Sequence, residues 1–170
     1  MTKLYKNQAF TTAHAGGCLC GDLRYEVDAP PMRLTWCSCH FCQKMTGTPM
    51  NALAGFSDAN FKLLKGTARV FTHVSEGSGK KLHLNSCPVC SSTVFVELER
   101  FPGVIGVMTG SLDDPNWFER TSENAKYIFT ECAQKGTVVQ AGFPVFAEHA
   151  TGRSGDAIAP TIYDQHHLVQ

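Results

Sequence analysis

Apolar and polar residues alternate in several short stretches of the chain. Within residues 22–27, the side chains of Leu23, Tyr25 and Val27 fall on one face, and the charged residues fall on the other. This alternation is typical of a strand with one buried face. Two consecutive prolines follow, and they end the stretch.

Similar short stretches predict further strands, separated by turns that contain Gly or Pro. Glu76-Gly77-Ser78-Gly79 lies between two of them and predicts a hairpin, and Phe101-Pro102-Gly103 predicts another. Helical periodicity is weak throughout, apart from one helical turn expected within residues 37–46. The pattern predicts an all-β fold of short antiparallel strands, arranged as a sandwich, barrel or tent. The predicted strands cover residues 50–54, 61–64, 68–74, 81–85, 93–98, 104–109 and 137–140.

Charge and hydropathy exclude several classes of protein. Fifteen basic residues balance fifteen acidic ones, so nucleic-acid binding is not expected. Residues 1–85 hold ten Lys/Arg against five Asp/Glu, and residues 86–170 hold the reverse, which gives balances of +5 and −5. No apolar run approaches the roughly 18 residues of a membrane helix. The first residues lack the apolar stretch of a secretory signal, so a cytoplasmic location is expected.

Eight cysteines give the sequence its strongest chemical signal. Seven of them lie in three groups with one or two residues between neighbours, a spacing that suits two thiolates on one metal ion better than a disulfide. The eighth, Cys132, stands apart and is interpreted as a half-buried thiol, with redox sensing as a weaker alternative. The three groups are Cys18 and Cys20; Cys37, Cys39 and Cys42; and Cys87 and Cys90.

The first and third groups together supply four thiolates, the ligand number of a structural zinc site. Each pair adjoins a predicted strand, so a zinc ion there would join the start of the sheet to its middle. Binding of a structural zinc is worth roughly 10–16 kcal/mol. Because a whole domain is stable by only about 5–15 kcal/mol, loss of this metal is expected to unfold the protein.

The middle group supplies only three thiolates, which is the pattern of a catalytic zinc with one open position. Two alternatives remain open: a fourth ligand from elsewhere could close the site, or the group could share ligands with the third group. His40 lies between two of the thiolates in a tight loop and is not expected to be that ligand. His73 and His83 are expected to be hydrogen-bonded on strands. Full or partial occupancy of this site also remains open.

The length of 170 residues suits one domain. Residues 1–15 show no periodicity and are expected to form an N-terminal arm. Residues 16–146 carry the strands and the cysteine groups and are expected to form a zinc-binding β domain. Residues 147–170 are rich in small side chains and are expected to form a tail or a peripheral arm.

The ordered set of motifs resembles the glutathione-dependent formaldehyde-activating enzyme family, which includes centromere protein V. The resemblance covers roughly residues 16–115, and its cysteine motifs in this order are far more specific than a lone pair of cysteines. The matching segments are Gly17-Cys18-Leu19-Cys20-Gly21, Leu23-Arg24-Tyr25, Cys37-Ser38-Cys39-His40-Phe41-Cys42-Gln43-Lys44, Thr46-Gly47, Cys87-Pro88-Val89-Cys90, Val94-Phe95 and Gly110-Ser111-Leu112-Asp113-Asp114-Pro115.

The resemblance implies a tent-like all-β fold with two zinc ions. It implies a structural zinc on Cys18, Cys20, Cys87 and Cys90, and a second zinc on Cys37, Cys39 and Cys42 at the active site. The implied activity is the condensation of glutathione with formaldehyde to S-hydroxymethylglutathione, formally the reverse of a carbon–sulfur lyase reaction.

The sequence departs from the family pattern at three places. Ser91 stands where the family usually has a glycine, at a position that often needs an unusual backbone angle. Tyr127-Ile128-Phe129 replaces a segment that usually begins with His, and the Trp commonly found downstream is missing. Residues 142–146 resemble the closing segment of the family.

Two classes of function follow from these observations. The first is a zinc-dependent carbon–sulfur lyase or synthase acting on a glutathione-type thiol and a small aldehyde. The second is a non-catalytic, zinc-stabilised binding module, in which a fourth protein ligand would close the second site.

For the enzyme, Asp113 and Asp114 are candidate acids, but they suit a turn equally well, so no catalytic acid is identified. A cationic rim for the thiol's carboxylates could come from Arg24, Arg33, Lys44, Lys80 and Lys81.

Overall fold

The computed structural model describes residues 12–152 and 154–170. Across these residues the chain forms short strands, one short α-helix and three 3₁₀ helices. The strands are β1 (His14–Gly17), β2 (Arg24–Val27), β3 (Arg33–Cys37), β4 (Asn51–Ser57), β5 (Phe61–Lys65), β6 (Arg69–Val74), β7 (Lys81–Ser86), β8 (Thr93–Leu98), β9 (Val104–Met108), β10 (Ala125–Ile128), β11 (Val138–Val139) and β12 (His167–Leu168). The helices are α1 (His40–Thr46), η2 (Asp58–Asn60), η3 (Thr109–Ser111) and η4 (Thr130–Cys132).

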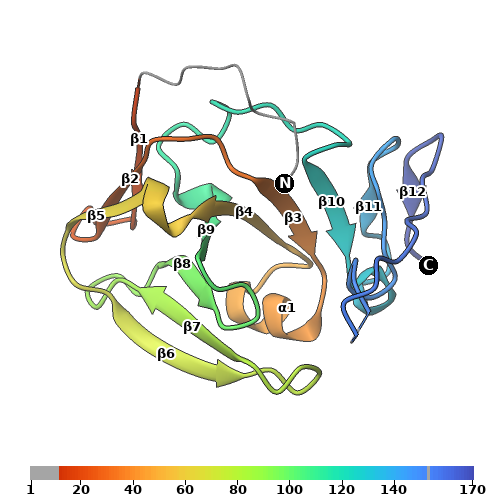
Figure 1. The fold of residues 1–170 in the computed structure, drawn as a ribbon, viewed down its shortest axis with the longest axis horizontal. Helices are drawn as coiled ribbons and strands as arrows, with labels where there is room; N and C mark the ends of the chain where they lie inside the picture. The colour runs from red at the N-terminus through yellow and green to blue at the C-terminus, as the bar shows by residue number, and fades with distance from the viewer. Residues whose placement is uncertain (1–11, 153) are drawn as a thin grey trace.

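These strands form three sheets, which confirms the predicted all-β class. The largest sheet has the order β10-β3-β4-β9-β8-β7-β6, the second β1-β2-β5, and the third β11-β12. Neighbouring strands are antiparallel except β10 and β3, which are parallel. Figure 1 shows β1, β2 and β5 at one end of the molecule and β10, β11 and β12 at the other.

The alternating stretch near the start of the described chain supplies the centre of the core. Leu23, Tyr25 and Val27 are fully buried, as the pattern predicted, while the residues between them are partly exposed. Phe56 of β4 and Val107 of β9 are buried in the same hydrophobic cluster. The packing of β2 against these strands therefore holds the smaller sheet on the larger one.

Both predicted hairpins are confirmed. β6 pairs with β7 across the turn at residues 75–80, and β8 pairs with β9 across the turn that contains Pro102. The stretch predicted at 137–140 contains β11, whose partner β12 lies near the C-terminus.

Two strands of the large sheet, β3 and β10, were not predicted. They have only five and four residues, and they are paired with each other although about 90 residues separate them in sequence. A short local pattern cannot indicate a partner at that distance in the chain. β3 also separates two environments, because Leu34 and Trp36 pack against core clusters while Cys37 packs in a different cluster on the opposite face.

Both ends of the described chain contribute to the sheets. Residues 1–11 of the expected N-terminal arm lie outside the described residues, and residues 14 and 15 of that arm begin β1. Beyond residue 140, the backbone of Pro144 accepts a hydrogen bond from Tyr127 of β10, and Val145 forms a bridge with Thr161. No helix among the described residues is long and apolar enough to cross a membrane.

Gly16 of β1 lies closely packed between Tyr25 of β2 and Ser111 of η3. A Cβ atom at this position would lie 2.2 Å from the hydroxyl oxygen of Tyr25 and 2.6 Å from the carbonyl oxygen of Ser111. The Tyr25 hydroxyl also shares a hydrogen bond of 3.0 Å with the Ser111 hydroxyl. Any side chain at Gly16 would therefore push β2 away from the η3 segment.

We expect Gly16→Ala to lower the free energy of unfolding by about 2 kcal/mol, the usual size of an overpacking effect. Gly110→Ala is the matched control, since a Cβ at Gly110 meets no atom within 4 Å. That control should change stability by no more than about 0.5 kcal/mol. Urea denaturation measures both, and equal stability of the two variants would contradict the close approach.

Candidate metal centres

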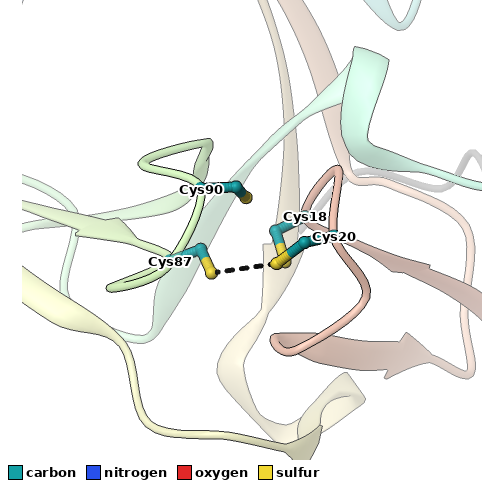
Figure 2. Close-up of side chains that lie close together, drawn as sticks. All are labelled: Cys18, Cys20, Cys87 and Cys90. Carbon is teal, nitrogen blue, oxygen red and sulfur yellow. Dashed lines mark hydrogen bonds between the residues drawn. The ribbon is translucent and has the colours of Figure 1, made fainter.

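Four of the cysteines come together from two loops that are far apart in sequence. Cys18 and Cys20 lie on the loop between β1 and β2, and Cys87 and Cys90 lie on the loop between β7 and β8. Their four sulfur atoms are all within 4.8 Å of one another. Figure 2 shows the side chains pointing toward a common centre, with Cys20 facing Cys87 across the gap.

The spacing of these sulfur atoms fits a tetrahedral zinc ion. The Sγ atoms of Cys18 and Cys20 are 3.6 Å apart, and those of Cys20 and Cys87 are 3.7 Å apart. Zinc–sulfur bonds of about 2.3 Å place the corners of a tetrahedron about 3.8 Å apart. These four cysteines, which we call the first cluster, thus have the ligand type, the number and the spacing of a structural zinc site.

Backbone amides in both loops point at the sulfur atoms. The N–H of Leu23 donates to Sγ of Cys18 at 3.2 Å, and the N–H of Val89 donates to Sγ of Cys87 at 3.4 Å. Hydrogen bonds from the side chain and the backbone of Ser92 lower the pKa of Cys90 to about 5. These donors favour thiolates, which are the form that binds a metal.

The turn of the second loop requires an unusual backbone angle at position 91. The N–H of Ser91 donates to the carbonyl of Cys87 at 3.0 Å, which closes the turn around the sulfur atoms. Ser91 has a φ of 61°, in the left-handed region that glycine adopts at little cost. The angle expected from the missing glycine is therefore present, and serine adopts it with strain.

The middle group of cysteines forms a second, separate cluster. Cys37 ends β3, Cys39 is the N-cap residue of α1, and Cys42 lies in the first turn of that helix. Their sulfur atoms also lie within 4.8 Å of one another, and the N–H of Cys42 donates to Sγ of Cys39 at 3.5 Å. The short helix forms here because Cys39 caps its start and Gly47, with a φ of 69°, ends it.

Crowding makes the ionisation of these three thiols unequal. Contacts with the thiols of Cys37 and Cys42, together with backbone N–H groups, lower the pKa of Cys39 to about 3. The contact with Cys39 raises the pKa of Cys37 to about 12, and contacts with both neighbours raise the pKa of Cys42. One of the three thiols can therefore ionise without a partner. Three thiolates this close repel one another unless a cation lies among them, so this set of ligands fits a metal ion.

No fourth His, Cys, Asp or Glu joins this second cluster within residues 12–152 and 154–170. His40 is exposed, His73 stacks on Phe41 with ring centroids 4.6 Å apart, and His83 shares a hydrogen bond of 2.9 Å with Thr72. Cys87 and Cys90 lie in the first cluster, so the middle group shares no sulfur ligand with them.

Side-chain hydrogen bonds fix the helix that carries Cys42. The side-chain amide of Gln43 donates to the carbonyls of Ser38 and Cys132, at 2.6 and 2.8 Å. Gln134 donates to the Gln43 side chain at 3.0 Å and also lines a hollow of about 360 Å³ beside it. Cys132 therefore contacts the site through its backbone, and its sulfur is not one of the clustered ligands. The sequence carried no signal for the role of Gln43.

The charged residues considered from the sequence lie in different places. Arg24 and Asp113 form a two-pronged ion pair that connects β2 to the segment after η3, and this pair lowers the pKa of Asp113. Asp114 accepts a hydrogen bond of 2.9 Å from the N–H of Asn116, as expected for a turn. Lys44 is exposed on α1, and Lys80 and Lys81 lie at the exposed hairpin between β6 and β7.

The family model that matches this chain agrees with the cysteine pattern. A family model described as glutathione-dependent formaldehyde-activating enzyme matches residues 13–132, a span that contains both clusters. Among solved structures, a crystal structure of a Rhodobacter sphaeroides protein is similar at 17% sequence identity. The match covers 58% of this chain and 87% of that one, with a TM-score of 0.46.

The strained backbone at Ser91 leads to a stability prediction. Ser91→Gly should raise the free energy of unfolding by about 0.5–1 kcal/mol, because relief of the left-handed strain exceeds the entropy that glycine adds to the unfolded chain. Ser91→Ala removes the same exposed hydroxyl but keeps the strain, so it should give no gain. Thermal denaturation of both variants with equal metal content checks this, and an equal gain in both would assign the effect to the side chain.

Proposed function

The chain belongs to the glutathione-dependent formaldehyde-activating enzyme family, and on that premise we propose that it condenses a glutathione-type thiol with a small aldehyde such as formaldehyde. In this reaction the thiol sulfur bonds to the carbonyl carbon, the carbon–oxygen double bond becomes single, and the thiol proton ends on the oxygen. The product is S-hydroxymethylglutathione when the substrates are glutathione and formaldehyde. The reverse reaction is that of a carbon–sulfur lyase.

The observation that carries this proposal is the three-sulfur composition of the second cluster. A purely structural zinc site has four protein ligands, whereas catalytic sites keep one position for water or substrate. The described residues add no fourth ligand to Cys37, Cys39 and Cys42. This composition favours an enzyme over a non-catalytic module with a closed site.

We assign zinc to both clusters in this proposal. Sulfur ligands favour zinc over the harder cations, which prefer oxygen. The first ion would have a structural role on Cys18, Cys20, Cys87 and Cys90, and the second would have a catalytic role on Cys37, Cys39 and Cys42. Zinc in the second cluster would supply Lewis acidity, which lowers the pKa of a thiol or polarises a carbonyl.

The residues around the second cluster would position the substrate and limit the access of water. Ile128 and Phe146 are buried against Cys37, and Phe129 packs beside them. Gln43 connects α1 to the backbone of Ser38 and Cys132, so the loop that carries the sulfur atoms is held at both sides. Such fixed placement of the reacting groups is a large part of catalysis for a simple addition.

The two clusters should respond differently to loss of a ligand. Cys87→Ser should lower the melting temperature strongly and remove zinc from the first cluster, because two loops of the core lose their connection. Cys39→Ser should leave the fold nearly as stable as wild type, reduce zinc from two ions per chain to one, and abolish thiol-dependent activity. Elemental analysis and thermal denaturation measure these effects.

Cys132→Ser is the matched control, because its sulfur belongs to neither cluster. This variant should keep both zinc ions and the activity. Equal loss of folding in the Cys39 and Cys87 variants would instead indicate two structural sites and favour the binding module.

Binding of the thiol itself can be followed with cobalt in place of zinc. Glutathione titrated to millimolar concentration should change the cobalt–thiolate absorption of the wild-type protein, since a new sulfur ligand alters that spectrum. The change should be absent in Cys39→Ser, whose remaining metal has four protein ligands. If the wild type with both sites loaded shows no change, direct thiol ligation is wrong.

A further inference from the structure

Four basic side chains gather on one side of the molecule around Phe101 and Thr151. The guanidinium carbon of Arg33 lies 4.4 Å from the centroid of the Phe101 ring, and that of Arg100 lies 5.7 Å from it. His149 stacks on the same ring at 5.9 Å. Lys126 lies close enough to lower the pKa of His149, after the larger effects of burial and Arg100. We call Arg33, Arg100, Lys126 and His149 the basic group.

No acidic side chain pairs with this group among the described residues. The ion pairs there join Arg24 to Asp113, Lys62 to Glu26 and Lys65 to Asp22. Burial lowers the pKa of Arg33, and burial together with Arg33 lowers the pKa of Lys126. Partly buried cations that repel one another are costly unless an anion joins them, so the group has the charge and the environment of an anion site.

Polar contacts orient two members of the group. Arg100 donates to the hydroxyl of Thr151 at 3.2 Å, and the N–H of Thr151 donates to Nδ1 of His149 at 3.2 Å. Because Nδ1 accepts this hydrogen bond, the neutral ring of His149 carries its proton on Nε2. Among the described residues, no group accepts a hydrogen bond from that N–H, so His149 presents a donor beside the cations.

The strand register places the basic group next to the second cysteine cluster. Arg33, Thr35 and Cys37 share one face of β3, because side chains alternate along a strand. In the parallel neighbour β10, Lys126 is paired with Thr35, and Ile128 is paired with Cys37. Lys126 therefore lies two residues along the strands from the position of Cys37, a distance of about 6.6 Å.

Two aromatic side chains connect the cluster with the basic group. Phe146 packs with Cys37, and the ammonium nitrogen of Lys126 lies 5.8 Å from the centroid of its ring. Phe129 packs with the same cluster, and its ring centroid lies 6.1 Å from that of His149. A ligand that reaches the sulfur atoms would thus lie across these rings and end among the cations.

The distance between Cys37 and Lys126 along the strands suits a thiol that carries a carboxylate one residue away. One extended residue spans about 3.3–3.6 Å, so the C-terminal carboxylate of a Cys-Gly unit lies within about 7 Å of the thiol-bearing residue. This length is close to the separation of Cys37 and Lys126 along the strands. Uncharged small thiols have no group that could use the cations.

We infer that Arg33, Arg100, Lys126 and His149 form a carboxylate-binding subsite that selects an anionic, peptide-like thiol for the second cysteine cluster. This inference rests on the proposed function and extends it to the residues that determine substrate specificity. Arg33, considered from the sequence only as one member of a cationic rim, has the central place in this subsite. Arg24, by contrast, is neutralised by Asp113.

The test separates carboxylate binding from thiol binding with three probes. S-methylglutathione has both carboxylates but a blocked thiol, 2-mercaptoethanol has a thiol but no carboxylate, and glutathione has both. The variants are Lys126→Met and Arg33→Gln, which remove charge and keep much of the side-chain length. Lys62→Gln is the control, because it removes one positive charge from β5, which belongs to the three-stranded sheet and not to the sheet of β3 and β10.

Calorimetry should show S-methylglutathione binding at least tenfold more weakly to each of the two variants than to the wild type or to Lys62→Gln. The cobalt spectrum should respond to 2-mercaptoethanol at the same concentration in all four proteins. Lys126→Arg should restore most of the S-methylglutathione affinity. Equal binding of S-methylglutathione by all proteins, or no binding by the wild type, would overturn the subsite.

The outcomes also distinguish this inference from the proposed function. If S-methylglutathione binding depends on Lys126 and Arg33 but no thiol alters the cobalt spectrum, the anion subsite stands and the thiol chemistry is wrong. If glutathione alters the spectrum at the same concentration in every variant, the thiol chemistry stands and the subsite is wrong.

Discussion

Repulsion between crowded thiolates is the constraint on which this structure depends. Four sulfur atoms from residues 18–20 and 87–90 meet with separations as short as 3.6 Å, and so many thiolates cannot be charged together without a cation. With a metal ion among them, the same crowding becomes a connection between two loops about 70 residues apart. That connection joins the end of β1, an edge strand of the three-stranded sheet, to the end of β7 in the seven-stranded sheet.

The second cluster depends on a different feature, the two faces of β3. Leu34 and Trp36 pack into the core on one face, while Cys37 lies with Ile128 and Phe146 on the other. The second cluster therefore lies outside the main core, against a small hydrophobic cluster of its own. The first cluster, in contrast, includes Cys18 and Cys87, which are buried in the main core, and Cys20, which is exposed. The same ligand chemistry is thus placed in two different packing environments.

Local patterns in the sequence predicted much of this fold. The alternation of Leu23, Tyr25 and Val27 identified β2, and the Gly- and Pro-containing turns identified both hairpins, because these signals involve neighbouring residues. β3 and β10 were missed, since each is short, and the strand partner of β10 is β3, about 90 residues away in the chain. The left-handed angle of Ser91 was anticipated from the absent glycine, which is again a local property.

The sequence by itself determined the three local groups of cysteines, because thiols with only one or two residues between them stay close along the chain. It also determined the all-β class through its alternation and turns. Only the tertiary structure decided which pairs meet, placing Cys87 and Cys90 with Cys18 and Cys20. Only the tertiary structure brought Arg33, Arg100, Lys126 and His149 together beside the middle cluster. Such groupings depend on strand pairing across long stretches of chain, and that pairing is set by the burial of the whole core rather than by any local pattern.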